Sequence, residues 1–600
     1  MSSNKEDFNN LVDRIDFLLK EKKIPELIKE SHKIIKQKKY ENFIFYGNLG
    51  LAYLSIQKYR LAIIYFNKIL KKYPTDARVH HNLGLAYKFS QNLNVAKNHF
   101  LKSIKNLDIF DFSFYELIEL LLENNEIYEA QKLINENNSL IPNDLTFFFE
   151  TGIFDLRFKN EKIFKYNLEK FNKKIKKYLS IIDKNKNYFK PSNINSKTNY
   201  IPLTNFRYTF YSNNSLLDQV NYIRILDTIT DQFSINKKFS ILKKNKKIKI
   251  AFASSIWRHH TIMKLFKNWI IKINKEKFDI NIIDFQSTRD ENYFEISKKV
   301  SKVILTNSNI ENDIKKIRNE NFNFLIYLDN HISRESVFLS TFKLAERQAC
   351  TWGHPMTSGS KNIDFFLSSE LMENDSSQKQ YIEKLIKLKN LSVYYEYPKF
   401  KEDASTKIFF DDKYLSIGML QSLFKIQPFE DKIYAEIINS NKNVKIYFLE
   451  SEIAQHSEVL KKRIEKFIKN KKDINRIKFL PRCNNNTFLN YAINCDFLID
   501  CPSWSGGNTH LESLSVNKPI ITIEGNLLKQ NHTTGMLKRI NIPSLICKNE
   551  IEFIEKIKEL SNSKSLINKY SEEISHRKHL LYEDHDAITS LENFLENNYH

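Results

Sequence analysis

The six residues Asn-Leu-Gly-Leu-Ala-Tyr occur twice in the first part of the chain, at 48–53 and again at 82–87, a spacing of 34 residues. Alanine recurs with the same period at Ala62, Ala96 and Ala130. Glycine and alanine at fixed positions let two helices cross closely, and a fixed period means that each helical unit stacks on the next. The N-terminal part therefore has to fold as a stack of repeated helical pairs.

Two prolines follow the same period. Pro74 and Pro142 lie two periods apart, at positions where a repeat ends. A period of 34 with small residues at helix crossings and a closing proline is the signature of tetratricopeptide repeats. We expect three such repeats within residues 1–150, with residues 8–40 forming a preceding helical pair or cap.

A glycine turn between two apolar runs stands out in the C-terminal part. The run 497–499 precedes a turn with Gly506 and Gly507, and a second run follows at 520–523. Strand, turn, helix and strand form a βαβ unit, in which the helix start offers unpaired N–H groups and a positive dipole end. Glu512 lies one turn inside that helix, where a carboxylate can accept hydrogen bonds from ribose hydroxyls. The segment favours a sugar-nucleotide diphosphate site, although similar turns occur in α/β proteins that bind nothing there.

Strand and helix patterns alternate over the second half of the chain. The expected strands fall into two sets, at 248–253, 278–284, 303–305 and 324–328, and then at 415–420, 444–448, 477–480, 497–500 and 520–523. Two alternating sets predict two parallel, doubly wound sheets with a ligand cleft between them. The expected class is α/β with an all-α N-terminal region. Its expected parts are tetratricopeptide repeats at 1–150, a helical connector at 151–245, a first Rossmann-like half at 246–405, and a second at 406–600 with closing C-terminal helices.

Composition narrows the class of protein. The formal net charge of +22 comes from lysines spread along the whole chain, without a dense basic block. This pattern favours a solvated lysine surface, so we expect only weak, non-specific nucleic-acid binding. The five cysteines form no CxxC pair, which fits a reduced protein without a disulfide framework or zinc site. With no apolar signal core and no apolar run of about 18 residues, a soluble, cytoplasmic protein without a membrane span is expected.

Seven motif segments follow one another between about residues 248 and 540. They are 253–261, 348–359, 363–370, 421–428, 479–481, 500–512 and 525–535. Together with the N-terminal repeats, this ordered set resembles the tetratricopeptide-containing O-linked N-acetylglucosamine transferases, in particular their SPINDLY-like bacterial branch. The resemblance implies a GT-B fold and inverting transfer of a sugar from a UDP-sugar. It implies neither a metal nor a cofactor, because the UDP-sugar is a substrate.

The resemblance places Lys425 against the donor diphosphate. A cation there would offset the charge that develops on the leaving group in glycosyl transfer. The family has a glutamine three positions before this lysine, whereas this chain has Gln421 four before and Ser422 three before. Both are therefore candidates for the same diphosphate contact.

The helix after the glycine turn supplies a second group of candidates. Gly507 lets the backbone approach a ligand, and Asn508 and Thr509 stand where the family often has two threonines. Both side chains can cap the helix and donate to phosphate, so an ordinary cap and a binding role can coexist. Glu512 stands where the family has an acidic residue on the ribose. His532, after the next strand, is expected near the diphosphate.

The first half supplies candidates for the sugar. His260 aligns with the family's active-site histidine, and a neutral imidazole there would accept a hydroxyl proton or orient the sugar. Its role is left open. The loop of Gly353, His354 and Pro355 with Thr357 presents backbone N–H groups at a strand end, and the family uses this loop against the donor sugar. A purely structural turn is the alternative.

The uracil is expected beside the segment that ends in Arg482 and Cys483, which would hold its edge through backbone groups as in the family. Phe488 occupies the position of a family histidine near the base, and either stacks on it or lies in the core. Asn485 replaces a family lysine, so that role does not transfer.

The leading interpretation is a glycosyltransferase that moves N-acetylglucosamine from a UDP-sugar to Ser or Thr hydroxyls of proteins bound by the repeats. One alternative is another UDP-hexose or an Asn acceptor. A second is a non-catalytic repeat scaffold with a sugar-nucleotide sensing domain. A third, nucleic-acid binding driven by charge, would be steeply salt-dependent. Acceptor identity and oligomeric state stay open, although such repeat arrays can dimerise.

Overall fold

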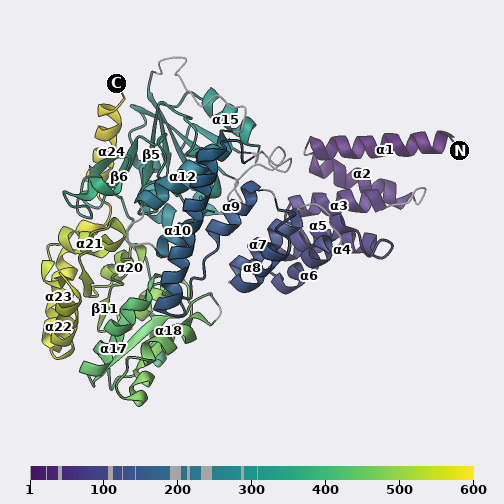
Figure 1. Ribbon diagram of the computed structural model, residues 1–600. Helices are drawn as coiled ribbons and strands as arrows, with labels where there is room; N and C mark the ends of the chain where they lie inside the picture. Colours follow the sequence, from purple (N-terminus) through teal and green to yellow (C-terminus); the bar gives the residue numbers. More distant parts are fainter. Residues whose placement is uncertain are drawn as a thin grey trace. The chain divides into compact units, whose positions relative to one another are not determined.

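The chain forms two compact units, Met1–Pro142 and Asn143–His600. The structure is a computed structural model. It describes residues 2–21, 23–37, 43–105, 112–124, 126–141, 143–189, 204–211, 216–231, 246–285, 289–306, 309–453 and 455–599. Figure 1 labels the elements used below.

The first unit consists of helices that pack in successive pairs. Its described helices are α1 (Ser2–Lys20), α2 (Ile24–Lys36), α3 (Phe43–Ser55), α4 (Tyr59–Leu70), α5 (Ala77–Phe89), α6 (Leu93–Ile104), α7 (Phe112–Glu123) and α8 (Ile127–Glu136). Helices α3 and α4 form one pair, and α5 and α6 form the next. The expected period thus corresponds to one helical pair. The predicted repeat end at Pro142 lies outside the described residues.

The repeated glycine marks the place where the two helices of a pair cross. A Cβ atom on Gly50 would overlap the ring of Phe66, and one on Gly84 would lie 2.5 Å from the ring of Phe100. Both phenylalanines are fully buried. The hexapeptide therefore repeats because an aromatic ring fills the space that a glycine leaves open.

A helical connector begins the second unit. It contains α9 (Asn143–Gly152), α10 (Glu161–Lys184), the short 3₁₀ helix η1 (Phe206–Phe210) and α12 (Leu216–Thr230). Aromatic side chains fill its core, with Tyr208 stacked on Phe171 at a centroid separation of 3.8 Å. The connector shares one continuous hydrophobic core with the two sheets that follow.

The first sheet has the strand order β3-β2-β1-β4-β5-β6-β7, and its strands pair in parallel. The strands are β1 (Ile248–Ser254), β2 (Phe278–Asp284), β3 (Lys302–Leu305), β4 (Phe324–Tyr327), β5 (Arg347–Thr351), β6 (Phe365–Ser369) and β7 (Lys384–Leu388). The helices of this half include α13 (Thr261–Lys272), α14 (Glu291–Ser297), α15 (Ile310–Asn319) and α16 (Arg334–Leu339). Four of these strands coincide with those expected from the sequence.

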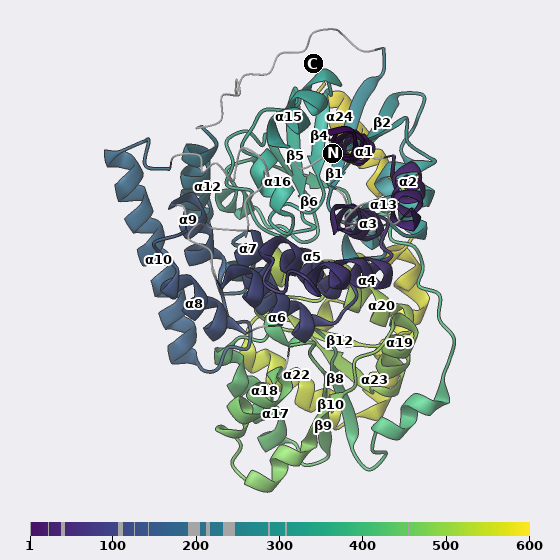
Figure 2. The same cartoon turned by 90° about the vertical axis from the view of Figure 1, so that its right-hand side faces the viewer.

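The second sheet repeats the arrangement with the order β10-β9-β8-β11-β12-β13, again with parallel pairs. Its strands are β8 (Leu415–Met419), β9 (Val444–Leu449), β10 (Ile477–Leu480), β11 (Phe497–Ile499), β12 (Ile520–Ile523) and β13 (Ile546–Cys547). Its helices include α17 (Asp431–Ser440), α18 (His456–Glu465), α19 (Asn485–Asn494), α20 (Asn508–Ser515), α21 (His532–Arg539), α22 (Glu550–Ser561) and α23 (Lys564–Arg577). Figure 2 separates the two sheets clearly. The expected α/β class with an all-α N-terminal region is confirmed.

Each sheet reverses its strand order once. The reversal lies between β1 and β4 in the first sheet and between β8 and β11 in the second. Loops at such points diverge to opposite sides and leave a crevice at the carboxyl ends of the strands, where doubly wound proteins bind ligands. These loops contain His260 in the first half, and Lys425 and the glycine turn in the second.

The last helix, α24 (His585–Asn597), packs on the first half although it belongs to the C-terminal part of the chain. The ring of Phe594 contacts Phe324 at 5.9 Å and Phe365 at 5.1 Å between centroids. The chain thus crosses back and ties the two halves together. Among the described residues, no helix is long and apolar enough to span a membrane.

The glycine pair within α3 gives a matched test of the repeat packing. We expect Gly50→Ala to destabilise the first unit by about 1–3 kcal/mol, because its methyl group would press on the buried Phe66 ring. Native-state hydrogen exchange of peptides from α3 and α4 measures this loss.

Gly47→Ala is the control. Its Cβ would lie 3.8 Å from Ile69, an ordinary contact, so alanine should stabilise the helix by about 0.5–1 kcal/mol. Equal effects of the two substitutions would contradict the packing described for Gly50.

Candidate functional site

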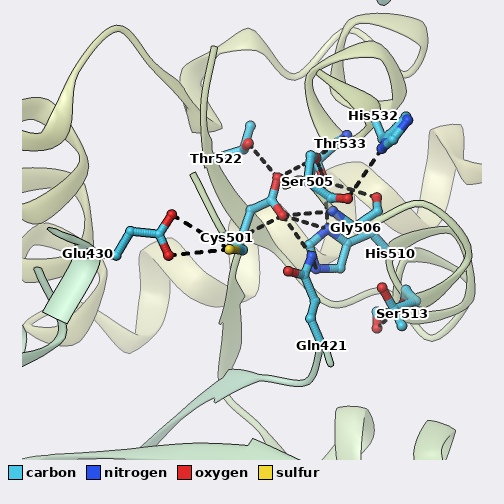
Figure 3. A network of polar contacts seen from close by, with 12 residues as sticks. Gln421, Glu430, Cys501, Ser505, Gly506, His510, Ser513, Thr522, His532 and Thr533 are labelled. Carbon is cyan, nitrogen blue, oxygen red and sulfur yellow. Dashed lines mark hydrogen bonds and ion pairs between the residues drawn. The ribbon is translucent and has the colours of Figure 1, made fainter. Parts of the chain in front are cut away.

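The buried carboxylate of Asp500, directly after β11, organises the glycine turn. Figure 3 labels its hydrogen-bond partners Gln421, Ser505 and Thr522. Its Oδ1 accepts hydrogen bonds from the backbone N–H groups of Cys501 and Gly506, each at 2.9 Å, and from Gln421 Nε2 at 2.8 Å. Its Oδ2 accepts from the hydroxyls of Ser505 at 2.5 Å and Thr522 at 2.7 Å. Five donors from the turn after β11, from β12 and from the loop after β8 thus meet at one carboxylate.

Protonation of this group follows from its neighbours. Burial raises the pKa of Asp500, but His510 and hydrogen bonds from Ser505, Thr522 and Gly506 outweigh it and bring the pKa below its ordinary value. His510 Nδ1 lies 3.6 Å from Asp500 Oδ1, and burial lowers the pKa of His510 to about 4. A carboxylate beside a neutral imidazole is the resulting arrangement.

The same network joins the glycine turn to the start of α21. His510 Nδ1 lies 2.5 Å from Thr533 Oγ1, and the Thr533 N–H donates to Ser505 Oγ at 2.9 Å. His532 Nδ1 donates to the Ser505 carbonyl at 3.2 Å. The predicted site residue His532 is therefore fixed against the turn, while its buried Nε2 has no hydrogen-bond partner among the described residues.

A second buried carboxylate supports the turn from its other side. Glu430 Oε1 accepts from the Ser503 N–H at 2.7 Å, and Oε2 accepts from the Cys501 thiol at 3.4 Å. The same thiol lies 3.3 Å from the Lys425 carbonyl. Burial raises the pKa of Glu430 to about 7 against these hydrogen bonds. The Lys425 loop and the glycine turn are thus held next to each other.

The start of α20 offers groups that the protein itself does not use. The buried atoms Asn508 Oδ1 and Thr509 Oγ1 have no hydrogen-bond partner within the described part of the chain. A Cβ atom built on Gly507 meets nothing within 4 Å, so the space beside the turn is open. No hydrogen bond or ion pair engages the Lys425 ammonium among the described residues. An open helix N-terminus beside an unengaged ammonium suits an anion.

The two candidates before Lys425 differ in their surroundings. Gln421 is fully buried and its amide donates to Asp500, whereas Ser422 is exposed. Ser422 is thus accessible to a ligand, and Gln421 is committed to the Asp500 network through its amide nitrogen. Which of them contacts a diphosphate stays a prediction.

His260 forms the N-cap of α13, where its Nδ1 accepts from the Ile262 N–H at 3.2 Å. Burial, Arg258 and the neighbouring His259 lower the pKa of His260 to about 4. The imidazole is therefore neutral at neutral pH. Because Nδ1 accepts, the proton resides on Nε2, which can donate to a ligand oxygen.

The loop after β5 is rigid. A Cβ atom on Gly353 would collide with the Leu328 carbonyl, so only glycine fits there. Thr357 Oγ1 and the Ser358 N–H both donate to the buried Glu383 at 2.7 Å. Pro355 is buried, and so is His354, whose Nε2 has no hydrogen-bond partner among the described residues.

The sequence reasoning missed His331, which follows β4 at the reversal of the first sheet. Its Nδ1 accepts from Gln219 of α12 at 3.0 Å, and its Nε2 donates to the Thr357 carbonyl at 2.9 Å. Its ring lies 5.3 Å from that of His354. The available signal was its place directly after a predicted strand, in the same manner as His260.

Side chains from the two halves meet near this loop. The rings of Trp352 and His532 lie 5.4 Å apart, and those of His354 and Trp504 lie 6.1 Å apart. The connector contacts both halves, because Phe206 packs on His354 at 5.4 Å and Phe210 packs on Trp504 at 4.5 Å between ring centroids. Of the predicted residues, His354 of the first half and His532 of the second therefore lie in one region of the second unit.

His260 and Glu512 line a common cavity of about 520 Å³. Lys264, Tyr395 and Asn485 also line it. Arg482 and Cys483, predicted to hold the uracil, do not line it, and Arg482 is exposed and ion-paired with Glu452. Phe488 is buried in the core. The uracil contact stays a prediction.

Comparison with known proteins agrees with this architecture. The tetratricopeptide repeat family model matches residues 44–76 and 77–106. A probable UDP-N-acetylglucosamine–peptide N-acetylglucosaminyltransferase SPINDLY of Solanum lycopersicum is 20% identical over 249 residues, which are 41% of this chain and 26% of that protein. The SPINDLY protein of Eustoma exaltatum subsp. russellianum is 22% identical over 240 residues, 40% of this chain and 26% of that protein. The chain thus spans about a quarter of the length of these relatives.

A solved structure matches nearly the whole chain. A mutant O-GlcNAc transferase of Thermobaculum terrenum covers 93% of this chain, and 98% of that structure is matched, with a TM-score of 0.65 and 13% identity. The likeness confirms the fold expected from the sequence, helical repeats followed by a GT-B pair of Rossmann-like halves.

The raised pKa of Glu430 leads to a testable prediction about how this residue supports the glycine turn. A raised pKa means that the folded state keeps a proton that the unfolded state releases above about pH 4.5. Wild type should therefore lose stability relative to Glu430→Gln as pH rises from about 4.5 to 7.5, by roughly 2–4 kcal/mol. Urea unfolding monitored by tryptophan fluorescence measures this difference.

The exposed Glu555 provides the control, since Glu555→Gln should shift the free energy of unfolding by less than about 0.5 kcal/mol at any pH in this range. A difference between wild type and Glu430→Gln that does not change with pH would contradict the buried, protonated state of Glu430.

Proposed function

We propose that this chain, a relative of the tetratricopeptide-containing O-linked N-acetylglucosamine transferases in sequence and fold, is a glycosyltransferase. It transfers a sugar, N-acetylglucosamine in the proposal, from a UDP-sugar to Ser or Thr hydroxyls of a protein. The observation that carries the proposal is the unused anion site where the open start of α20 adjoins the Lys425 loop.

In this reaction the leaving diphosphate is the group that most needs stabilisation in the transition state. As the bond from the anomeric carbon to the diphosphate breaks, negative charge accumulates on the diphosphate oxygens. The Lys425 ammonium, the hydroxyl of Thr509 and the N–H groups at the start of α20 provide donors that are fixed before the reaction. In this proposal they stabilise the leaving UDP without a metal ion.

The acceptor hydroxyl attacks from the side opposite to the diphosphate, so the configuration at the anomeric carbon inverts. The hydroxyl proton passes to a water molecule as the new bond forms. His260 has its proton on Nε2, which suits it to orient a sugar or acceptor oxygen by donating a hydrogen bond. Glu512, which shares a cavity with His260, is assigned to the ribose hydroxyls.

The repeats are assigned to the protein acceptor. Their helical pairs form the kind of stacked array that binds extended polypeptide segments along one face. Acceptor choice then depends on the first unit and donor choice on the second.

The test compares two lysines at opposite ends of β8. Lys425→Met should weaken UDP binding about 10- to 100-fold, because a charge-assisted hydrogen bond contributes about 1.5–3 kcal/mol. Isothermal titration with UDP measures the dissociation constant, and hydrolysis of UDP-N-acetylglucosamine measures turnover.

Lys413→Met is the control, because Lys413 is exposed before the amino end of the same strand and should bind UDP as wild type does. The proposal fails if wild type neither binds UDP nor turns over any UDP-sugar. It also fails if both substitutions weaken binding equally.

A further inference from the structure

An ion pair joins the two halves at the edge of the candidate site. Lys264 of α13, in the first half, pairs with the carboxylate of Glu512 in α20 of the second half. The same ammonium donates to Asn485 Oδ1, at the start of α19, at 3.2 Å. All three residues line the cavity of about 520 Å³ that also contains His260.

The two oxygens of the Glu512 carboxylate are used differently. Oε1 accepts from Lys264 and from the Tyr395 hydroxyl at 3.4 Å. Within the described part of the chain, no hydrogen bond reaches Oε2. Burial and the neighbouring Glu512 raise the pKa of Tyr395, so its hydroxyl keeps its proton and remains a donor. The carboxylate is therefore held by one oxygen and leaves the other available in the cavity.

A purely structural role for the Lys264–Glu512 ion pair would not explain why Glu512 Oε2 accepts no hydrogen bond among the described residues. Lys267, one turn along α13, pairs with Glu295 and Glu396 of its own half, and neither contact engages the second half. The Glu512 side chain is 7% exposed, and taking a carboxylate out of water costs free energy that one partner rarely recovers. A half-used, oriented carboxylate in a cavity is an arrangement suited to a ligand that brings its own donors.

We propose that Lys264, assisted by Tyr395, is a positioning residue that orients Glu512 so that its second oxygen accepts hydrogen bonds from the vicinal hydroxyls of a nucleotide ribose. This inference rests on the proposed function, because it concerns the nucleoside end of the same donor. The ribose subsite then requires both halves, since the acceptor group comes from the second and the group that orients it from the first.

The experiment compares two probes in isothermal titration, UDP and 2′,3′-dideoxy-UDP. Wild type should bind UDP at least about 10-fold more tightly, because two hydroxyl donors to a carboxylate are lost in the dideoxy probe. Lys264→Met should reduce this preference to about 3-fold or less, since the carboxylate is no longer oriented. The ratio of the two dissociation constants cancels the effect of the lost positive charge, because that loss weakens the binding of both probes alike.

Two further variants keep the test decisive. Lys264→Arg retains a cation and should restore most of the ribose preference. Lys315→Met should match wild type, because Lys315 is exposed on α15 and does not line the cavity. The inference is overturned if Lys264→Met keeps the wild-type ratio of the two dissociation constants. It is also overturned if every variant weakens the binding of UDP and of the dideoxy probe by the same factor. Failure of wild type to bind UDP would instead refute the proposed function, so the two failures are distinguishable.

Discussion

The candidate site depends on one buried carboxylate. Asp500 directly follows β11 and accepts hydrogen bonds from the glycine turn, from β12 and from the loop after β8, so three separate segments share one anchor. A buried carboxylate is stable only when its lone pairs are filled, and here five donors fill them. With the turn held by this anchor, a Cβ atom at Gly507 would meet nothing within 4 Å, and Asn508 Oδ1 and Thr509 Oγ1 at the start of α20 have no hydrogen-bond partner among the described residues. The protein thus satisfies its own buried charge next to the positive end of a helix.

The connector, helix α24 and an ion pair join the two halves. These contacts explain why residues of both halves line the candidate site. The connector contributes hydrogen bonds to both, since Gln219 donates to His331 in the first half and the Phe210 carbonyl accepts from Gln427 in the second. The helix α24 returns from the second half to the first. Near the ligand region, Lys264 and Glu512 pair across the cleft. The connector contacts and the Lys264–Glu512 pair lie near the carboxyl ends of the strands, where both strand orders reverse, whereas α24 packs at the amino ends of β4 and β6.

Local patterns predicted much of this fold. The repeat period, the alternating apolar runs and the glycine turn all specify structure within some thirty residues, and they gave the helical repeats, nine of the strands and the helix that contains Glu512. Strands β5, β6 and β7 were harder, because Arg347, Ser368 and Lys384 interrupt their apolar pattern. His331, His510 and Lys264 were missed as site residues for another reason. Their hydrogen-bond partners Thr357, Thr533 and Glu512 are 23 or more residues away in sequence, so these contacts can be recognised only once the sheets bring the residues together.

The most direct measurement is hydrogen–deuterium exchange of the full chain with and without UDP. Binding at the anion site should slow exchange of amides in residues 505–511 and 421–426, because ligand oxygens would accept from the N–H groups at the start of α20 and order the Lys425 loop. Exchange in the repeat residues 43–105 should not change. Unaltered exchange at 505–511 in the presence of saturating UDP, or protection confined to other segments, would contradict a nucleotide diphosphate site at the glycine turn.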